Sequence, residues 1–248
     1  MPVRAHAADK KRLLVVTVTK GFRHDTIPTA EKVIGELGTA GNYKVDYART
    51  DAELTQKMSA DGLKSYDGVV FASTTGDLPL PSPQAFLDWV KAGHAFIGIH
   101  SASDTFHGFR PYLEMLGGEF KQHGAEVGVT VHVADRSFPG IQSLGDTFEI
   151  PKEEIYQFQN FEPDQVHLLL YLDHHPNNGE PGLYPLAWCR SYGKGRVFYT
   201  SIGHREDVWS APWYRSHLEG GIEWALGLAK GDDKPLPLPA IDALPAHK

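Results

Sequence analysis

The chain has 248 residues, 41% of them hydrophobic, which is enough to bury the core of one sheet-based domain. Its formal net charge is −7, and its 24 lysines and arginines are scattered without a basic block, which argues against a nucleic-acid partner. The sequence also lacks an apolar run of about 18 residues, so it predicts no membrane span.

Residues 1–11 are predicted to be disordered or to be the remnant of a signal peptide. The segment Ala5-His6-Ala7 resembles the end of a signal peptide whose apolar stretch is missing. This favours an exported, periplasmic location, with a cytoplasmic location as the alternative. Residues 12–230 are predicted to form a single α/β domain, and residues 231–248 a Pro-rich C-terminal tail.

Apolar, β-branched runs alternate with helical patterns in the first half of the chain. Such runs suit strands that helices cover on both faces, so the alternation predicts right-handed crossovers and a parallel sheet. The predicted strands are residues 12–19, 43–48, 68–72 and 95–99. The predicted helices open at Thr26-Ile27-Pro28, at Asp51 as N-cap, and at Ser82-Pro83.

The second half is less regular. Its strand-like runs are residues 128–134, 166–172, 185–190 and 196–202. The turn Gly193-Lys194-Gly195 joins the last two runs as a hairpin, so part of the sheet is expected to be antiparallel. A last helix is expected from about Trp213 to Ala229. The only cysteine, Cys189, falls in a predicted strand, where a buried structural thiol is expected rather than a nucleophile.

Reactive side chains follow the predicted strands. In open parallel sheets ligands bind beyond the carboxyl ends of the strands, so the loops at those ends are the places to search. The four loops with reactive residues are 21–25 (GFRHD), 73–77 (STTGD), 100–104 (HSASD) and 203–207 (GHRED). Because these loops combine His or Asp with Gly or Ser, we expect them to form a functional site.

His100 follows a predicted strand directly, where a sharp turn would direct its side chain into the crevice. The alternative is a core histidine whose ring is satisfied by its neighbours. A serine triad is not expected, because His stands where a nucleophile elbow carries Ser or Cys, and Ser101 is one position off. Imidazole suits general acid/base work near neutral pH, or metal ligation.

A divalent metal is left open by the sequence. The candidate ligands are His24, His100, His123 and His204, with Asp104 or Glu154. None of them shows a tight spacing such as H-E-x-x-H, so the support is weak. No nucleotide cofactor is expected, because the sequence has neither of the common phosphate-binding glycine motifs.

Two further segments and one aromatic residue are candidates for the site. The loop 117–124 holds glycines that either serve a turn or let a ligand approach the backbone, and it ends near His123. Glu153-Glu154-Ile155-Tyr156 offers carboxyl and phenol groups, with solvated surface as the alternative. Trp209 follows the His204 loop and is a candidate to stack on a sugar ring, whereas most other aromatic residues are core candidates.

Six ordered motifs resemble the ThuA-like (trehalose utilisation) family over residues 12 to 228. They are Gly21-Phe22-Arg23-His24 after a strand, Gly98-Ile99-His100-Ser101-Ala102-x-Asp104, Gly117-Gly118-x-Phe120-x-x-His123, Glu154-x-Tyr156, Pro185-x-Ala187-Trp188, and Gly193-Lys194-Gly195-Arg196-Val197-Phe198-Tyr199-x-x-x-Gly203-His204. Any one of these motifs alone would be a weak signal, but six in order are specific.

The resemblance implies the fold of class I glutamine amidotransferases, a flavodoxin-like three-layer sandwich with a mostly parallel central sheet. Those enzymes carry Cys at the elbow after a central strand, and a later strand ends in His-x-Glu. Here the elbow carries His100, while Gly203-His204-Arg205-Glu206 resembles the His-x-Glu end. Because the thiol nucleophile is missing, glutaminase activity is not expected.

The resemblance further implies a role in catabolism of a disaccharide or glycoside, alongside enzymes that oxidise sugars at C3. A 3-keto group acidifies the neighbouring C–H bonds, so a base can drive elimination or isomerisation. His100 and His204 are the candidate acid/base groups, and Asp104 and Glu206 are expected to orient them. Arg23 or His24 is expected to hold an enolate oxygen. The predicted substrate-binding residues are Arg23, Ser101, His123, Glu154, Tyr156 and Trp209.

The leading hypothesis is therefore an enzyme, a lyase, hydrolase or isomerase, acting on a small sugar substrate by histidine acid/base or metal-assisted chemistry. The alternative is a non-catalytic sugar-binding or regulatory module on the same scaffold. The sequence identifies neither the sugar nor the oligomeric state. The enzyme hypothesis requires His100 and His204 to lie side by side at a solvent-accessible crevice.

Overall fold

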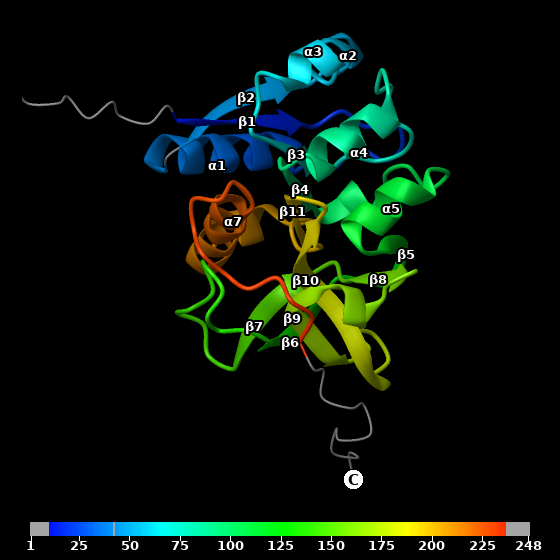
Figure 1. Cartoon of the computed structure of the whole chain (residues 1–248). Helices are drawn as coiled ribbons and strands as arrows, with labels where there is room; N and C mark the ends of the chain where they lie inside the picture. Colours follow the sequence, from blue (N-terminus) through cyan, green and yellow to red (C-terminus); the bar gives the residue numbers. More distant parts are fainter. Residues whose placement is uncertain (1–9, 42, 237–248) are drawn as a thin grey trace, which may run out of the picture.

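The computed structural model of the chain describes residues 10–41 and 43–236 (Figure 1). Predictions for residues 1–9 and 237–248 lie outside this part. The strands are β1 (Lys11–Val16), β2 (Tyr43–Ala48), β3 (Gly68–Ala72), β4 (Ala95–Ile99), β5 (Glu119–His123), β6 (Val127–Val133), β7 (Thr147–Glu153), β8 (Tyr156–Gln159), β9 (His167–His174), β10 (Pro181–Tyr192) and β11 (Gly195–Thr200). The helices are α1 (Ile27–Ala40), α2 (Asp51–Lys57), α3 (Ala60–Leu63), α4 (Pro83–Lys91), α5 (Arg110–Leu116), α6 (Glu206–Ser210) and α7 (Pro212–Ala225), with the 3-10 helices η1 (His100–Asp104) and η2 (Pro163–Gln165).

Within the described residues the main sheet has nine strands in the order β2-β1-β3-β4-β11-β10-β9-β6-β7. The pairs from β2 to β11 are parallel, as predicted for the first half of the chain. The pairs from β11 to β7 are antiparallel and include the predicted β10–β11 hairpin. The α/β class is confirmed, and the sheet is more mixed than expected because the second half extends it as an antiparallel meander.

The parallel strands are buried on both faces, which explains their continuous apolar runs. In β1, Leu13 and Val15 join the core under α1 and α7, whereas Leu14 and Val16 join the core under α4 and α5. All four side chains are fully buried. Each contributes on the order of 1.5–3 kcal/mol of apolar burial, so this strand anchors both layers of helices (Figure 1).

Several predicted boundaries differ from the structure. Helix α2 is capped by Thr50, one residue before the predicted Asp51, because Thr50 and Glu53 form a reciprocal capping box. Helix α7 ends at Ala225 and not near Ala229, because Gly227 adopts a left-handed conformation with φ of +76°. Helices α5 and α6 and strands β5, β7 and β8 were not predicted; β5 and β7 are polar and largely exposed.

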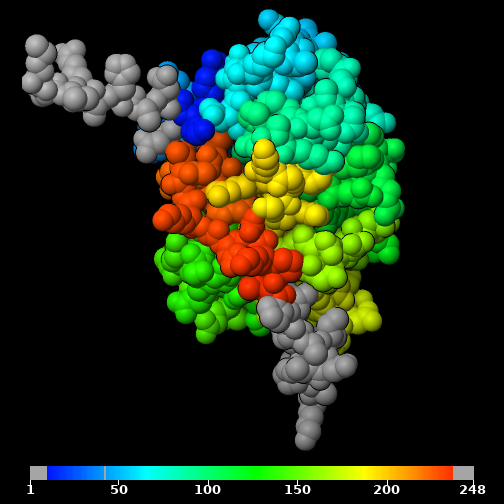
Figure 2. All heavy atoms as spheres, in the orientation of Figure 1, coloured from blue at the N-terminus to red at the C-terminus, as the bar shows by residue number. Residues whose placement is uncertain are grey.

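The start of the Pro-rich tail packs on its own domain. The His167 Nδ1 atom donates to the Lys234 carbonyl at 2.6 Å, and the Ser191 hydroxyl bonds to Asp233. The red end of the chain crosses the face shown in Figure 2. The thiol of Cys189 is buried beneath it and contacts the Asp232 carbonyl, as expected for a structural cysteine. None of the helices described here is long and apolar enough to cross a bilayer.

Candidate functional site

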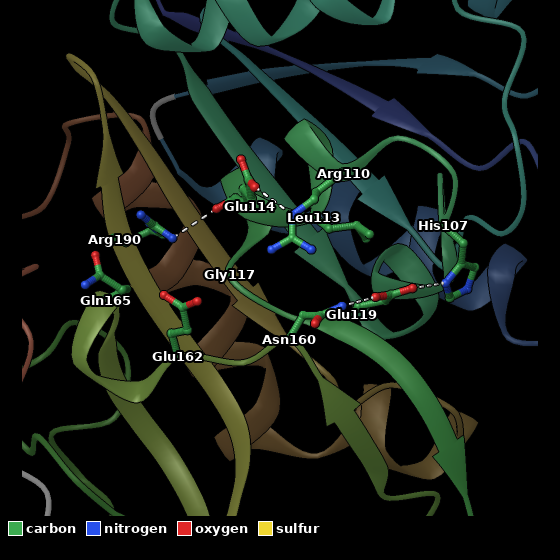
Figure 3. A pocket seen from close by; sticks show the side chains of 10 residues that line it. All are labelled: His107, Arg110, Leu113, Glu114, Gly117, Glu119, Asn160, Glu162, Gln165 and Arg190. Carbon is green, nitrogen blue, oxygen red and sulfur yellow. Dashed lines mark hydrogen bonds and ion pairs between the residues drawn. The ribbon is translucent and has the colours of Figure 1, made fainter.

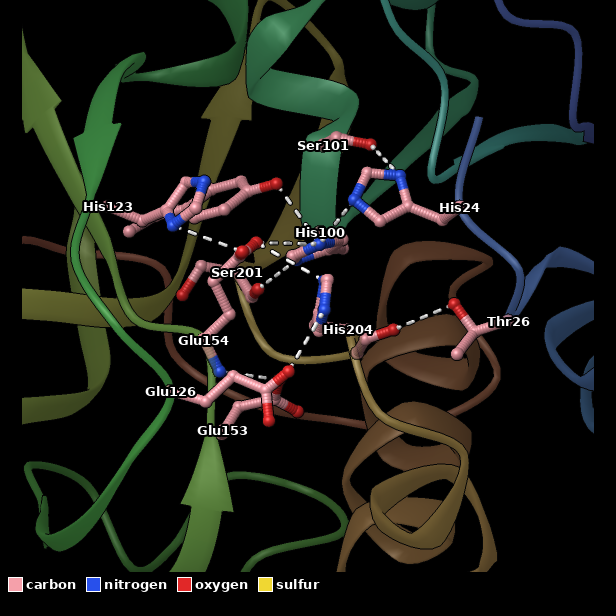
Figure 4. A network of polar contacts seen from close by, with 12 residues as sticks. His24, Thr26, His100, Ser101, His123, Glu126, Glu153, Glu154, Ser201 and His204 are labelled. Atoms are coloured by element: carbon pink, nitrogen blue, oxygen red, sulfur yellow. Dashed lines mark hydrogen bonds and ion pairs between the residues drawn. The ribbon is translucent and has the colours of Figure 1, made fainter. Parts of the chain in front are cut away.

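Side chains from both halves of the sheet converge on one cluster (Figure 4). His24 comes from the loop after β1, His100 from the end of β4, and His204 from the loop after β11. Glu154 lies between β7 and β8, directly beside the parallel strand ends. His100 and His204 lie side by side as expected, with ring centroids 5.5 Å apart. The expectation that both rings meet a solvent-accessible crevice holds only for His204, because His100 is fully buried.

The backbone at His100 makes the sharp turn that the sequence indicated. Ile99 is extended, and His100 has a φ of +53°, a left-handed conformation that is uncommon outside glycine. A side chain at Gly98 would place its Cβ 2.9 Å from the Tyr199 ring, so glycine allows the close packing below this turn. The turn directs the His100 ring into the cluster.

The ring of His100 is fixed at both nitrogens. Its Nδ1 atom donates to the Ser201 carbonyl at 2.8 Å, which leaves Nε2 facing the cluster. That Nε2 atom lies 3.0 Å from His24 Nε2 and 3.0 Å from the Tyr156 hydroxyl. His100 is fully buried, so it forms the floor of the site and does not meet solvent.

Glu154 is the hub of the cluster. Its Oε2 atom lies 3.5 Å from His100 Nε2 and 3.3 Å from His204 Nδ1, and its Oε1 atom lies 3.1 Å from His123 Nδ1. The sequence assigned this residue to substrate binding and assigned the orienting role to Asp104 and Glu206. In the structure Glu154 takes that orienting position.

Asp104 and Glu206 do not reach the cluster. Asp104 accepts a hydrogen bond from His107 Nε2 at 2.7 Å, because η1 turns it away from His100. Glu206 is exposed at the start of α6 and accepts a hydrogen bond from the Thr29 hydroxyl at 3.2 Å. Their predicted role of orienting His100 and His204 is therefore wrong.

Trp209 cannot stack on a sugar. Its ring is fully buried in the core, and its indole N–H donates to the Gly203 carbonyl at 2.8 Å. Ser101 is buried too, and its hydroxyl lies 3.4 Å from His24 Nδ1, where it supports that ring. Arg23 is exposed and donates from Nη1 to the Thr17 carbonyl at 2.9 Å.

Burial and charge divide the histidines into two kinds. Burial, reinforced by the nearby His204, lowers the pKa of His24 to about 4. Burial likewise lowers the pKa of His100 well below its usual value. The contact with the Glu154 carboxylate raises the pKa of His204. The cluster thus holds two rings that favour the neutral form and one that favours the protonated form.

One side of the cluster reaches solvent. The side chains of His204 and His123 are 25% and 42% exposed. A shallow hollow of about 430 Å³ opens beside His204, and its lining includes Thr26 and Glu126. Phe22, which the sequence reasoning did not select, is 66% exposed with its ring 4.8 Å from that of His24. Phe22 lies in the loop after the first strand, two residues from His24, and this position could have identified it from the sequence as a candidate site residue.

A more enclosed hollow of about 350 Å³ lies beside α5 and β5 (Figure 3). Its lining includes none of the clustered histidines, and its charged groups pair mostly with one another. Arg110 Nε lies 2.9 Å from Glu114, and His107 Nδ1 lies 2.7 Å from Glu119. The histidine cluster is therefore the better candidate for a functional site than this more enclosed hollow.

Four side chains of the cluster have the arrangement of metal ligands. His24, His100, His204 and Glu154 each offer one ligand atom, and these atoms lie within 4.8 Å of one another. The sequence named these three histidines and His123, with Asp104 or Glu154, as candidate ligands. The structure keeps Glu154 in the group and leaves His123 and Asp104 outside it.

Comparisons with known proteins identify the family of the chain. The profile of the ThuA family, described as trehalose utilisation, matches residues 12–225. The chain belongs to the ThuA family. The resemblance found in the sequence motifs is thereby confirmed, and the ThuA family suggests a carbohydrate-related function. No curated protein sequence matches this ThuA-family chain.

Solved structures share the fold of this ThuA-family member. A ThuA-like protein from Parabacteroides merdae has a TM-score of 0.71 at 19% identity, covering 88% of this chain and 90% of that one. A ThuA-like protein from Bacteroides uniformis has a TM-score of 0.68 at 20% identity, covering 91% and 95%. A β-galactosidase from Bacillus circulans sp. alkalophilus has a TM-score of 0.54 at 11% identity, covering 88% of this chain and 30% of that one. At these identities the likeness concerns the fold alone.

Proposed function

We propose that this chain is an enzyme of carbohydrate catabolism that moves a proton next to the carbonyl group of a keto-sugar or keto-glycoside. The observation that carries the proposal is the convergence of three imidazoles and one carboxylate, from separate strand ends, beside a solvent-accessible hollow. Packing alone gives no reason to bury His24 and His100 nitrogen to nitrogen. The family's description as trehalose utilisation supports a sugar substrate.

The proton transfer is assigned to the rim of the cluster. His204 and His123 are the rings that reach solvent, and both contact Glu154. When His123 takes a proton from carbon, the Glu154 carboxylate stabilises the imidazolium that forms, and His204, which favours the protonated form, can return a proton. The Tyr156 hydroxyl donates to His100 Nε2 at 3.0 Å below this rim, where it holds the buried ring in place.

We assign to Phe22 the role of stacking against the substrate's sugar ring. This aromatic side chain is exposed beside His24, and a sugar that stacks on it would extend over the mouth of the cluster.

The proposed scaffold is the three-layer, amidotransferase-like sandwich. The parallel strands follow the order β2-β1-β3-β4-β11, which is the flavodoxin-like order, and helices pack on both faces. The turn at His100 stands where those enzymes hold their thiol. The chain's cysteine, Cys189, is buried in β10, so the proposal excludes a glutaminase mechanism.

The test is to incubate the protein with a 3-keto-glycoside in D₂O. Loss of substrate is followed by chromatography, and deuterium uptake beside the carbonyl by NMR. Glu154→Gln keeps the shape of the side chain but removes the charge that orients the rim histidines, so the rate should fall about 100-fold or more. His94→Gln is the matched control, because His94 lies just before β4, at the end of the strand opposite the cluster, and should leave the rate unchanged.

The absence of both turnover and deuterium exchange with a panel of keto-glycosides would refute the proposal that the chain is an enzyme. If the same sugars bound to the protein with weaker affinity in Phe22→Ala, the alternative of a non-catalytic sugar-binding module would replace it. The exposed Phe22 beside the cluster is the observation that favours that alternative. Undiminished turnover in Glu154→Gln would also contradict the assigned chemistry.

A further inference from the structure

We infer that His24, His100, His204 and Glu154 together bind a divalent first-row transition-metal ion of the Zn²⁺ type. The inference rests on the proposed function in that it assigns a cofactor to the same site, and its test measures metal binding directly. It starts from the four ligand atoms that lie within 4.8 Å of one another.

The spacing of these atoms fits one ion. Zinc bonds of about 2.0–2.1 Å in a tetrahedron place neighbouring ligand atoms about 3.3 Å apart. His24 Nε2 and His100 Nε2 are 3.0 Å apart. Glu154 Oε2 is 3.5 Å from His100 Nε2 and 3.3 Å from His204 Nδ1. These three edges are close to that length, and the other pairs of ligand atoms lie within 4.8 Å, a spread that small side-chain rotations can close around one ion.

Each ring has an outer partner at the nitrogen that faces away from the shared point. His100 Nδ1 donates to the Ser201 carbonyl at 2.8 Å. His24 Nδ1 lies 3.4 Å from the Ser101 hydroxyl, and His204 Nε2 lies 3.4 Å from Glu126 Oε1. Such outer partners are what fix the tautomer and orientation of metal-bound histidines.

The inner nitrogen of His204 faces the Glu154 carboxylate. His204 Nδ1 is buried and has no hydrogen-bond partner among the described residues, although Glu154 Oε2 lies 3.3 Å from it. Both atoms are potential metal ligands. A divalent ion placed between them can replace the proton that this pair otherwise shares and can bond to both.

The donor set indicates the class of metal. Three imidazoles and one carboxylate suit Zn²⁺ and its first-row neighbours, whereas Mg²⁺ and Ca²⁺ prefer sites made of oxygen. Thiolate-binding soft ions are disfavoured because Cys189 is buried in β10, away from the cluster. When bound, such an ion supplies Lewis acidity toward a carbonyl oxygen.

A bound metal ion would give the two rim histidines different roles. His204 becomes a ligand, while His123 stays outside the group of four with its side chain 42% exposed. Its Nδ1 atom is held by Glu154 Oε1 at 3.1 Å and by the Gly124 carbonyl at 2.9 Å. The proton transfer of the proposed function then belongs to His123, whose Nε2 is free of these contacts.

The experiment titrates Co²⁺ and Zn²⁺ into the full chain after treatment with EDTA. We expect one ion per chain, with the visible absorption of low-symmetry, four- or five-coordinate Co²⁺, displaced by Zn²⁺. His204→Asn and Glu154→Gln should each weaken binding tenfold or more, whereas His123→Gln and His94→Gln should retain it within about threefold. Circular dichroism in EDTA checks that each variant is folded.

The outcomes separate this inference from the proposed function. Absence of stoichiometric binding at micromolar metal, or equal binding by His204→Asn and the unmodified chain, would overturn the metal site. Turnover of a keto-glycoside by a protein that shows no stoichiometric metal binding would overturn the metal site and leave the enzyme standing. Tight 1:1 binding that His204→Asn abolishes, in a protein without turnover, would support the metal site and refute the enzyme.

Discussion

His217 on α7 offers a test of the core that does not depend on the site. The ring is fully buried against Phe198, and neither of its nitrogens has a hydrogen-bond partner among the described residues. Burial lowers the pKa of His217 from 6.5 to about 3. Between these two values the unfolded chain binds a proton that the folded chain does not. The free energy of unfolding therefore falls as the pH falls from 6.5 toward 3.

The size of this effect follows from the two pKa values. One pKa unit corresponds to about 1.4 kcal/mol, so lowering the pH from 7 to 5 should cost about 2 kcal/mol through this residue alone. His217→Leu removes the titrating group and also an unsatisfied polar ring. The variant should therefore be at least as stable at pH 7, and its advantage should grow by about 2 kcal/mol at pH 5.

The assay is urea unfolding of both proteins at pH 7, 6 and 5, followed by circular dichroism with matched ionic strength. All other titrating groups are common to the two chains, so the difference between the two unfolding free energies isolates His217. A difference that stays constant over this range would refute the reasoning, because it would mean that the ring is protonated or solvated in the folded state.

Three further predictions concern single residues. Phe22→Ala should raise KM about fivefold, because the substrate loses a stacking contact worth about 1 kcal/mol, and should change the free energy of unfolding by no more than about 0.5 kcal/mol. A lowered kcat at unchanged KM would contradict the assignment of Phe22 to substrate stacking. Gly98→Ala should destabilise the fold by about 1–3 kcal/mol in thermal or urea unfolding, because its Cβ would lie 2.9 Å from the Tyr199 ring; wild-type stability would show that the packing is loose. Cys189, whose burial raises its pKa well above the usual value, should react with a thiol reagent such as DTNB only after unfolding, so rapid labelling of native protein would contradict the buried strand.

The parallel half of the fold could be predicted because its signals are local. Strands such as 68–72 are continuous apolar runs, and the helices between them begin at recognisable caps. The polar strands β5 and β7 carry Lys, Glu and Gln, and only their pairing with β8 and β6 makes them strands. No local pattern in the sequence contains that information.

In the site, too, only the part that belongs to the parallel strands could be predicted from the sequence. Convergence of His24, His100 and His204 follows from one rule, that parallel strands place their carboxyl ends at the same edge. The sequence named Glu154 only as one of several candidates. Its central position among the histidines could not be predicted, because it depends on how the antiparallel half folds back over that edge. Trp209 was misassigned because its burial is decided by the packing of α6, which the sequence did not reveal.

The cluster is assembled from two structurally separate sources. The imidazoles of His24, His100 and His204 belong to the parallel strand ends, whereas Glu154, Tyr156 and His123 belong to the β5, β7 and β8 region of the second half. The first group forms the floor of the cluster, and the second sets the charge beside that floor and lines the approach to it. Grafting the segment from residue 117 to residue 159 between members of the family is thus the direct route to a changed preference for substrate.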